Sequence, residues 1–286
     1  EEGLGKPRKD VFLDADMQRL LAEELHPPFC DHTGEAGEKL PFSPRSFRDF
    51  MLYREHALQA ARGYAARYLP ASGPVVQAYE KLVRRPFPAF LPAARWNEYP
   101  IYYQGNHLSL VPSGSAIPIP SFAEGEVDYE LELGAVLVRP LRDAHPEEAL
   151  AAVGAFFVIN DFSIRCLQRS EMTSGFGPVK AKSFATAMSV EVVPASEIAN
   201  RLESLSGEVW INGERRTRCS SAGPHFSFGE AIAYASQGET LYPGEVLATG
   251  TWPGGSGLEA GEMLKEGDEV ELRIEGVGVV RNQLVS

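Results

Sequence analysis

The sequence predicts an α+β protein, mainly β, in which short helices accompany mixed sheets. Several segments in the middle and carboxy-terminal parts alternate polar and apolar residues, or run continuously apolar, as strands do. The helical patterns do not alternate regularly with these strands, as a doubly wound fold requires. The 286 residues are 44% hydrophobic and 23% charged, which provides a large core and argues against wholesale disorder.

Helical patterns dominate the first 70 residues. Residues 14–25 place apolar side chains on one face of a helix that Asp14 or Asp16 could cap. Prolines and glycines over 26–44 predict a loop. Good helix formers over 46–69 predict a second helix.

Strand patterns follow. Residues 127–138 alternate and then become continuously apolar, which predicts a strand that becomes buried on both faces. Residues 207–218 contain Asn212-Gly213 between two extended runs, a strong signal for a hairpin with a type I′ turn. Residues 270–285 repeat the strand pattern.

Two further segments predict short helices. They are residues 146–156 and residues 228–236. In the second, Ser227 lies three residues before Glu230, which is the capping-box pattern. The sequence shows no internal repeat and no low-complexity tract.

Charge and composition exclude several classes of protein. The chain has 27 basic and 39 acidic residues, a net charge of −12, whereas a nucleic-acid binder needs a basic face. No run approaches about 18 apolar residues, so we expect no transmembrane helix and no membrane partner. The first ten residues lack a secretory h-region. The three cysteines form no disulfide pattern, so we expect reduced thiols and a cytoplasmic protein.

Carboxylates are the strongest chemical signal. The sequence contains no phosphate-binding loop, dinucleotide fingerprint, H-E-x-x-H motif or nucleophile elbow, and the glycine-rich residues 249–257 are expected to form a loop. Glu130 and Glu132 are two residues apart on a strand, so their side chains leave one face about 6.5 to 7 Å apart. Such a pair is either the solvated face of an edge strand or a site for a hard divalent cation such as Mg²⁺.

Asp161 ends the long apolar run 151–160, where functional groups commonly emerge from a buried strand. It could equally cap the next helical turn. Arg165 and Gln168 follow on the same helical face, where they either face a common ligand or form a surface salt bridge. His56 is the best candidate for a general base among six histidines, although a lone histidine is often structural.

The chain resembles the fumarylacetoacetate hydrolase family. The resemblance is carried, in order, by YELELGAVLVRP, INDFSIRCLQ, GPVKAKSFATAMS, INGE, LYPGEVLATGTWPG and LKEGDEVELRIEGVG, and it covers about residues 45–286. It implies a mixed β-sheet roll with short helices, a homodimer and a bound divalent metal. We therefore expect a catalytic domain over 46–286, preceded by a short, truncated amino-terminal segment over 1–45.

The resemblance also implies roles for individual residues. The metal ligands would be Glu130, Glu132 and Asp161, with Asp49 and Thr186 as further members of the metal site. The catalytic residues would be His56, Lys182, Gln168 and Arg165, and the substrate-binding residues Tyr103 and Thr251.

The chain departs from the family pattern at several positions. Met51, Ala65 and Met172 stand where fumarylacetoacetase itself has substrate-contacting tyrosines and an arginine. Lys265 stands where that enzyme has the acid that orients its histidine. We expect another acid to replace it, with Glu55, Glu262 and Glu266 as candidates.

The family resemblance, together with the carboxylates and His56, implies a divalent-metal-dependent hydrolase that cleaves a carbon–carbon bond in a small acylpyruvate or β-diketo acid. Mg²⁺ is the expected metal, with Mn²⁺ or Ca²⁺ as alternatives. The same chemistry would also serve a decarboxylase, hydratase or isomerase of 2-oxo or 2-hydroxydienoic acids, and a non-catalytic family member is a further alternative. The expected partners are the keto acid substrate and a second copy of the chain.

Overall fold

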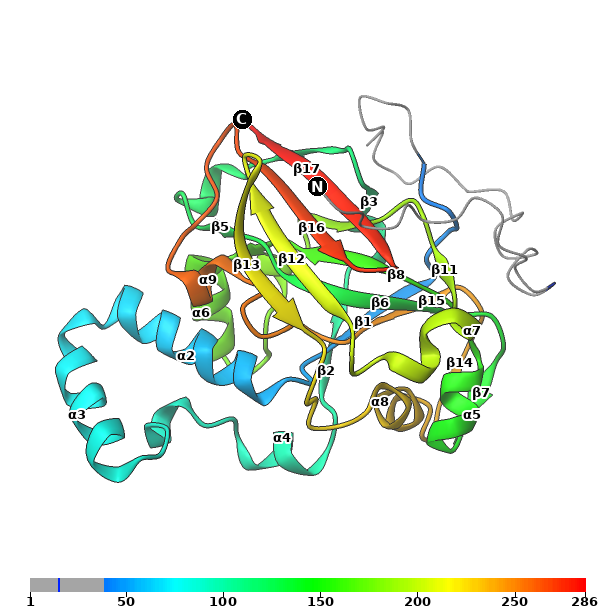
Figure 1. The fold of residues 1–286 in the computed structure, drawn as a ribbon, viewed down its shortest axis with the longest axis horizontal. Helices are drawn as coiled ribbons and strands as arrows, with labels where there is room; N and C mark the ends of the chain where they lie inside the picture. The colour runs from blue at the N-terminus through cyan, green and yellow to red at the C-terminus, as the bar shows by residue number, and fades with distance from the viewer. Residues whose placement is uncertain (1–14, 16–38) are drawn as a thin grey trace.

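The computed structural model describes Ala15 and residues 39–286, which fold around two mixed sheets (Figure 1). In spatial order, the eight-stranded sheet comprises β2 (Tyr102–Gly105), β1 (Ser46–Phe50), β15 (Glu245–Ala248), β6 (Leu131–Leu137), β8 (Val153–Asp161), β10 (Thr186–Met188) and β3 (Leu110–Pro112), and β11 (Val193–Pro194) also pairs with β8. The five-stranded sheet comprises β13 (Glu214–Ser220), β12 (Ser206–Ile211), β16 (Glu269–Ile274), β17 (Gly278–Val285) and β4 (Ala116–Pro118). Two small sheets pair β14 (Thr240–Leu241) with β7 (Leu141–Arg142) and β5 (Val127–Asp128) with β9 (Ser163–Ile164).

Short helices surround these sheets. They are α2 (Arg54–Tyr68), α3 (Gly73–Val83), α4 (Ala94–Glu98), α5 (Pro146–Ala151), α6 (Arg165–Thr173), α7 (Ala195–Ile198), α8 (Phe228–Ala235) and α9 (Gly257–Ala260). In Figure 1, α2 and α3 extend from one side of the sheets, and α5 and α8 pack together at the other. The structure is thus mainly β with short helices, as the sequence predicts.

The side-chain alternation along β6 assigns each face of the main sheet. Leu131 and Leu133 belong to the large core, which the five-stranded sheet also lines through residues such as Leu272. Val136 packs into a second, smaller core on the opposite face. Glu132 shares the face of Val136, because the two residues are an even number of positions apart on one strand.

Local sequence signals predicted several elements correctly. The hairpin joins β12 to β13, and Asn212 and Gly213 have the positive φ values, 53° and 77°, that a type I′ turn requires. Helix α8 begins with the predicted capping box, in which Ser227 accepts a hydrogen bond from the backbone N–H of Glu230. The strand patterns at 127–138 and 270–285 correspond to β5 with β6 and to β16 with β17.

Two helix predictions were partly wrong. The helix expected over 46–69 begins only at Arg54, because Ser46–Phe50 pairs in parallel with β15, almost 200 residues away in the sequence. The helix expected over 146–156 ends at Ala151, and β8 starts at Val153. In both cases pairing within the sheet outweighs local helix propensity. The helix expected over 14–25 and most of the loop over 26–44 lie outside the described residues. Among the described helices, none has the length and apolar character needed to span a membrane.

Candidate metal centre

Three buried carboxylates meet on the face of the main sheet that carries Glu132. They are Asp49 in β1, Glu132 in β6 and Asp161 at the end of β8, and one oxygen from each lies within 4.8 Å of the others. β15 separates β1 from β6, and Ala248, which lies opposite Asp49 on β15, adds little bulk there. These three residues define what we call the carboxylate cluster.

Two oxygens of the cluster have no hydrogen-bond partner. They are Oδ1 of Asp49 and Oε2 of Glu132, both buried. Burial, reinforced by the neighbouring carboxylates, raises the pKa of Asp49 and of Glu132 well above the usual range. Burial likewise raises the pKa of Asp161. A divalent cation would satisfy the free oxygens and offset the repulsion, so the donor set fits a hard ion that prefers oxygen ligands.

Neutral side chains donate hydrogen bonds to Asp161 and Glu132. Asp161 accepts hydrogen bonds from the hydroxyl of Tyr103 at 2.7 Å and from the hydroxyl of Thr186 at 3.0 Å. Glu132 accepts one from the hydroxyl of Thr251 at 3.2 Å. Burial, with Asp161 and Asp49 close by, raises the pKa of Tyr103 well above its ordinary value, so this phenol remains a donor.

Glu130 lies next to the cluster but is bound by two cations. Its carboxylate pairs with Arg165 at 2.8 Å and with Nζ of Lys182, which also pairs with Asp161 at 2.5 Å. Burial alone would raise the pKa of Glu130, but Lys182 and Arg165 reverse this effect and lower it. Burial would likewise lower the pKa of Lys182, but Asp161 and Glu130 raise it, so Lys182 stays charged. The structure therefore places Asp49 inside the three-carboxylate group and Glu130 in an ion-pair network beside it.

His56 lies in the first turn of α2 and pairs with an acid that sequence reasoning missed. Its Nδ1 is 2.5 Å from Oε1 of Glu259, and both side chains are almost fully buried. Glu259 also accepts hydrogen bonds from the backbone N–H of Gly254 at 2.8 Å and from the hydroxyl of Ser256 at 3.2 Å. Because a carboxylate can only accept, Nδ1 of His56 carries the proton and Nε2 is the free basic nitrogen.

The three acids proposed to orient His56 do not do so. Glu55 accepts a hydrogen bond from Gln59, Glu262 lies 3.9 Å from Arg216, and Glu266 is exposed. The partner is Glu259, from α9. One local signal could have indicated that a helix begins just after Ser256, because Glu259 lies three residues beyond this N-cap, as Glu230 lies beyond Ser227.

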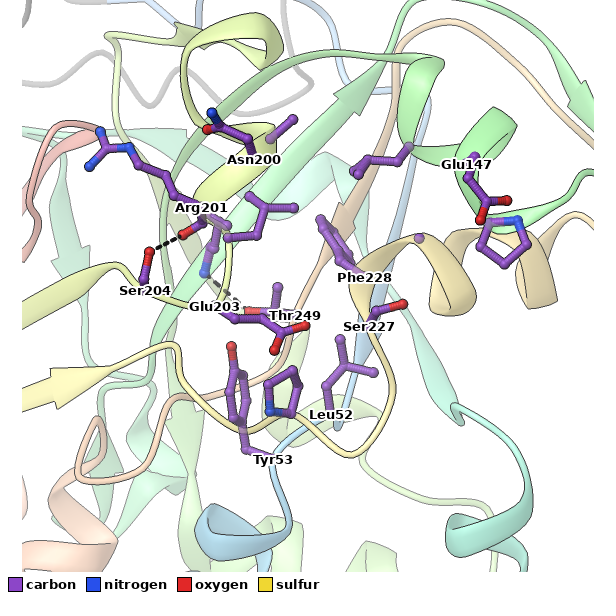
Figure 2. A pocket seen from close by; sticks show the side chains of 17 residues that line it. Leu52, Tyr53, Glu147, Asn200, Arg201, Glu203, Ser204, Ser227, Phe228 and Thr249 are labelled. Atoms are coloured by element: carbon purple, nitrogen blue, oxygen red, sulfur yellow. Dashed lines mark hydrogen bonds between the residues drawn. The ribbon is translucent and has the colours of Figure 1, made fainter.

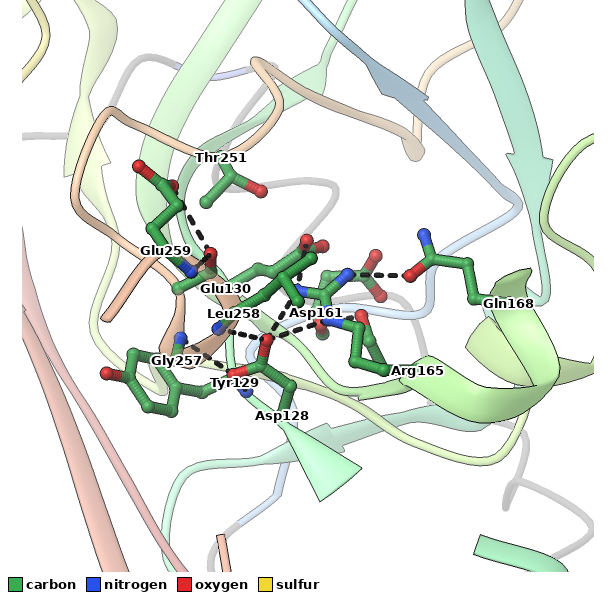
Figure 3. Close-up of polar contacts among 12 residues, drawn as sticks. Asp128, Tyr129, Glu130, Asp161, Arg165, Gln168, Thr251, Gly257, Leu258 and Glu259 are labelled. Atoms are coloured by element: carbon green, nitrogen blue, oxygen red, sulfur yellow. Dashed lines mark hydrogen bonds and ion pairs between the residues drawn. The ribbon is translucent and has the colours of Figure 1, made fainter. Parts of the chain in front are cut away.

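Arg165 and Gln168 come together at the start of α6. Nη1 of Arg165 donates to Oε1 of Gln168 at 2.6 Å (Figure 3). The hydroxyl of Tyr64, from α2, donates to the same oxygen at 2.7 Å. Since the amide oxygen is engaged twice, the amide NH₂ of Gln168 is left to face other groups. Asp161 belongs to β8 and does not cap α6, whose N-cap is Ile164.

The positions that depart from the family pattern are mostly exposed. Met51 and Met172 are 38% and 50% exposed, and Lys265 lies on the surface. Ala65 is half-buried in α2. None of these four side chains belongs to the carboxylate cluster.

The structure also contains a cavity of about 500 Å³, which Tyr53 and Phe228 help to line (Figure 2). Its lining also includes Leu52, Leu133 and Thr249, together with Arg201 and Glu203. Leu133 follows Glu132 on β6, so the two side chains point to opposite faces of the sheet. None of the three carboxylates lines the cavity, which is therefore separate from the candidate metal centre.

The fold defines a β-rich class of protein with two mixed sheets and a buried acidic site that could hold a divalent metal, and comparison with known proteins identifies the family. The family described as fumarylacetoacetate (FAA) hydrolase C-terminal matches residues 47–285. The chain belongs to this family.

Individual relatives have different activities. The mitochondrial oxaloacetate tautomerase of Rattus norvegicus is 29% identical over 259 residues, which cover 86% of this chain and 81% of that protein. The 2,4-didehydro-3-deoxy-L-rhamnonate hydrolase of Sphingomonas sp. (strain SKA58) is 34% identical over 161 residues, which cover 55% of each chain. The chain thus spans only about half the length of this second relative.

A solved structure supports the fold. Fumarylpyruvate hydrolase from Pseudomonas aeruginosa, in complex with Mn²⁺ and pyruvate, superposes with a TM-score of 0.61 at 23% identity. The match covers 85% of this chain and 90% of that one. The two-sheet architecture is therefore the fold expected for the family.

Proposed function

We propose that this protein is a divalent-metal-dependent hydrolase that cleaves a carbon–carbon bond in a small acylpyruvate or related β-diketo acid. The observation that carries the proposal is the carboxylate cluster, with two free buried oxygens, together with the His56–Glu259 pair. We propose Mg²⁺ as the metal, with Mn²⁺ as a substitute, held by Asp49, Glu132 and Asp161. Glu130 remains a candidate ligand if its ion pairs rearrange.

Each group has a defined task in this proposal. When bound, the cation acts as a Lewis acid that draws electron density from the oxygens of a dicarbonyl substrate. His56 takes a proton from water through Nε2, because Glu259 holds Nδ1 and prevents the ring from turning. The resulting hydroxide adds to the carbonyl carbon, and the carbon–carbon bond breaks with its electron pair leaving as the enolate of pyruvate. The proton that His56 took from water is then returned to the enolate carbon, so the products are pyruvate and a free acid.

Buried cations stabilise the charge that develops as the bond breaks. Lys182 and Arg165 are 4% and 2% exposed, so their charges act in a water-poor environment. Gln168 has a free amide NH₂, and we propose that this group and the hydroxyls of Tyr103 and Thr251 contact substrate oxygens.

The second candidate is a tautomerase, isomerase or decarboxylase, which the oxaloacetate tautomerase relative favours. Such a reaction moves a proton or releases CO₂ and needs no attack by water. Both readings use the same cluster, so only the products separate them.

Product analysis decides between these readings. The full chain, loaded with Mg²⁺ or Mn²⁺, is incubated with a panel of acylpyruvates and with oxaloacetate, and the products are identified by NMR. We expect pyruvate and a free acid in equal amounts from an acylpyruvate. Keto–enol exchange or CO₂ alone would contradict the hydrolase proposal, and no turnover by the metal-loaded chain would favour a non-catalytic member.

We also propose that the chain forms a homodimer, on family analogy. Sedimentation velocity at micromolar concentration tests this. A monomer under those conditions would contradict it.

A further inference from the structure

Asp128 is a fully buried acid that lies outside the carboxylate cluster. Its carboxylate accepts four hydrogen bonds, two at each oxygen (Figure 3). Oδ1 accepts from the backbone N–H groups of Tyr129 and Gly257, both at 2.7 Å. Oδ2 accepts from Nε of Arg165 at 2.7 Å and from the backbone N–H of Leu258 at 2.8 Å. Both oxygens of this carboxylate therefore accept two hydrogen bonds each, which fills its accepting sites.

Asp128 contacts the short helix that carries the partner of the proposed general base, His56. Gly257 and Leu258 are the first two residues of α9, so Asp128 anchors the start of this short helix. The next residue is Glu259, which binds Nδ1 of His56. The position of Glu259, and through it the orientation of the His56 ring, depends on where α9 begins.

Asp128 also contacts Arg165, which belongs to the ion-pair network around Glu130. Arg165 donates through Nε to Asp128, and its Nη2 lies 2.7 Å from the same carboxylate. Nη2 also donates to Glu130, and Nη1 donates to Gln168. A guanidinium group is planar and rigid, so holding one edge fixes the other donors. Asp128 therefore sets the plane in which Arg165 meets both Glu130 and Gln168.

Gly257 shows how closely these groups are packed. A Cβ atom at Gly257 would lie 2.5 Å from Oδ1 of Asp128 and would also overlap the carbonyl oxygen of Glu262. One of these groups would have to move. The glycine is required here by the close approach of Asp128 to the backbone.

We infer that Asp128 is a positioning residue that holds the Arg165 network and the Glu259–His56 pair in one fixed relation. A disturbance on one side of Asp128 is then transmitted to the other. The catalytic consequence of this coupling rests on the proposed function, but the coupling itself is a property of the fold.

The substitution Asp128→Asn tests the role of the carboxylate. An amide has the same shape but only one accepting oxygen, so its NH₂ group must face two N–H donors whichever way it turns. Asp268→Asn is a matched control, because Asp268 also accepts from a backbone N–H and from a side-chain amide, in an exposed turn. In the full chain, we expect Asp128→Asn to lower kcat by about 10²-fold through misplacement of the reacting groups. We expect unchanged Mn²⁺ affinity, and no change in either quantity for Asp268→Asn.

Two further variants test the coupling without substrate and from opposite sides. Gly257→Ala disturbs the α9 side, and Gly73→Ala is its control, because a Cβ at Gly73 meets nothing within 4 Å. Arg165→Lys disturbs the other side. The readout is the ¹H–¹⁵N resonance of Arg165 Nε–H and that of His56 Nδ1–H in the full chain, each assigned by its loss on substitution of that residue.

We expect Gly257→Ala to move the Arg165 Nε–H resonance and Arg165→Lys to move that of His56 Nδ1–H. If either variant leaves the resonance on the far side of Asp128 at its parental position, the inference is wrong. These two variants decide the matter even if Asp128→Asn does not fold. Because the resonances do not depend on turnover, moved resonances in a chain that cleaves no acylpyruvate would overturn the proposed function alone.

Discussion

Replacing Asp49 by asparagine should stabilise the metal-free protein and abolish its response to metal. One oxygen from each carboxylate of the cluster lies within 4.8 Å of the others. Two unit charges at that distance repel by about 3.5 kcal/mol at an effective dielectric constant of about 20. Asp49 faces two such neighbours, Glu132 and Asp161. Holding it protonated at pH 7, against an ordinary pKa of 3.8, costs only about 4 kcal/mol. Keeping Asp49 protonated therefore costs less free energy than keeping all three carboxylates charged. This cost of about 4 kcal/mol is the most by which Asp49 can destabilise the metal-free protein.

The sign of the pH dependence follows from the raised pKa values. An acid whose pKa is higher in the folded protein destabilises it above the ordinary pKa, and this penalty is relieved as the pH falls through the folded value. The metal-free parent should therefore gain stability between pH 8 and pH 5.5. Asp49→Asn removes the repulsion and should be more stable at pH 7 by about 1 to 4 kcal/mol, because Lys182 offsets part of the penalty in the parent.

Urea unfolding of the chelated parent and of Asp49→Asn, at pH 5.5, 7 and 8, measures these differences. When the same unfolding curves are measured with Mn²⁺ present, the free energy of unfolding of the parent should rise and that of Asp49→Asn should not change. Asp268→Asn should behave as the parent does. A less stable Asp49→Asn protein, or one that binds Mn²⁺ as tightly as the parent, would refute the reasoning.

Three further substitutions test other parts of the site. His56→Ala should lower turnover by about 10²- to 10⁴-fold with Mn²⁺ affinity nearly intact, and equal turnover in steady-state assays would remove it from the mechanism. Glu130→Gln leaves the charge of Lys182 without one of its partners and should lower the free energy of unfolding by about 3 to 5 kcal/mol; calorimetric titration with Mn²⁺ then shows whether Glu130 is also a ligand. Tyr64→Phe removes the hydroxyl that donates to the Gln168 oxygen. It should lower kcat several-fold and change the melting temperature by no more than a few degrees. A larger effect on the melting temperature than on kcat would mean that Tyr64 contributes only to packing.

The parts of the fold that could be predicted depend on neighbours in the sequence. Asn212-Gly213 specifies its turn because the backbone there needs positive φ, and Ser227 caps α8 three residues before Glu230. The strand over Ser46–Phe50 could not be predicted, because its partner β15 is distant in the sequence. Its residues are compatible with a helix until that partner is present.

The His56–Glu259 pair illustrates the same limit within the site. These residues are 203 positions apart, and nothing near His56 indicates which acid will reach it. The family pattern pointed to the position of Lys265, whereas α9 delivers Glu259 six residues earlier. An acid in a different place can thus make the same contact, because the contact depends on the position of the carboxylate and not on its number in the chain.

The sequence alone determined that acids stand on or at the ends of buried strands, because strand periodicity and apolar runs are local properties. The strand pattern singled out Glu130, Glu132 and Asp161 but left a solvated strand face and a helix cap as alternatives. The family resemblance then implied that all three are metal ligands, with Asp49 and Thr186 as further members of the site. Only the tertiary structure decided how their charges are balanced. Lys182 and Arg165 reach Glu130, whereas Asp49 arrives from a distant strand to join Glu132 and Asp161. Electrostatic energy depends on distance in space, so the choice between an ion pair and a cation site is made when the chain folds.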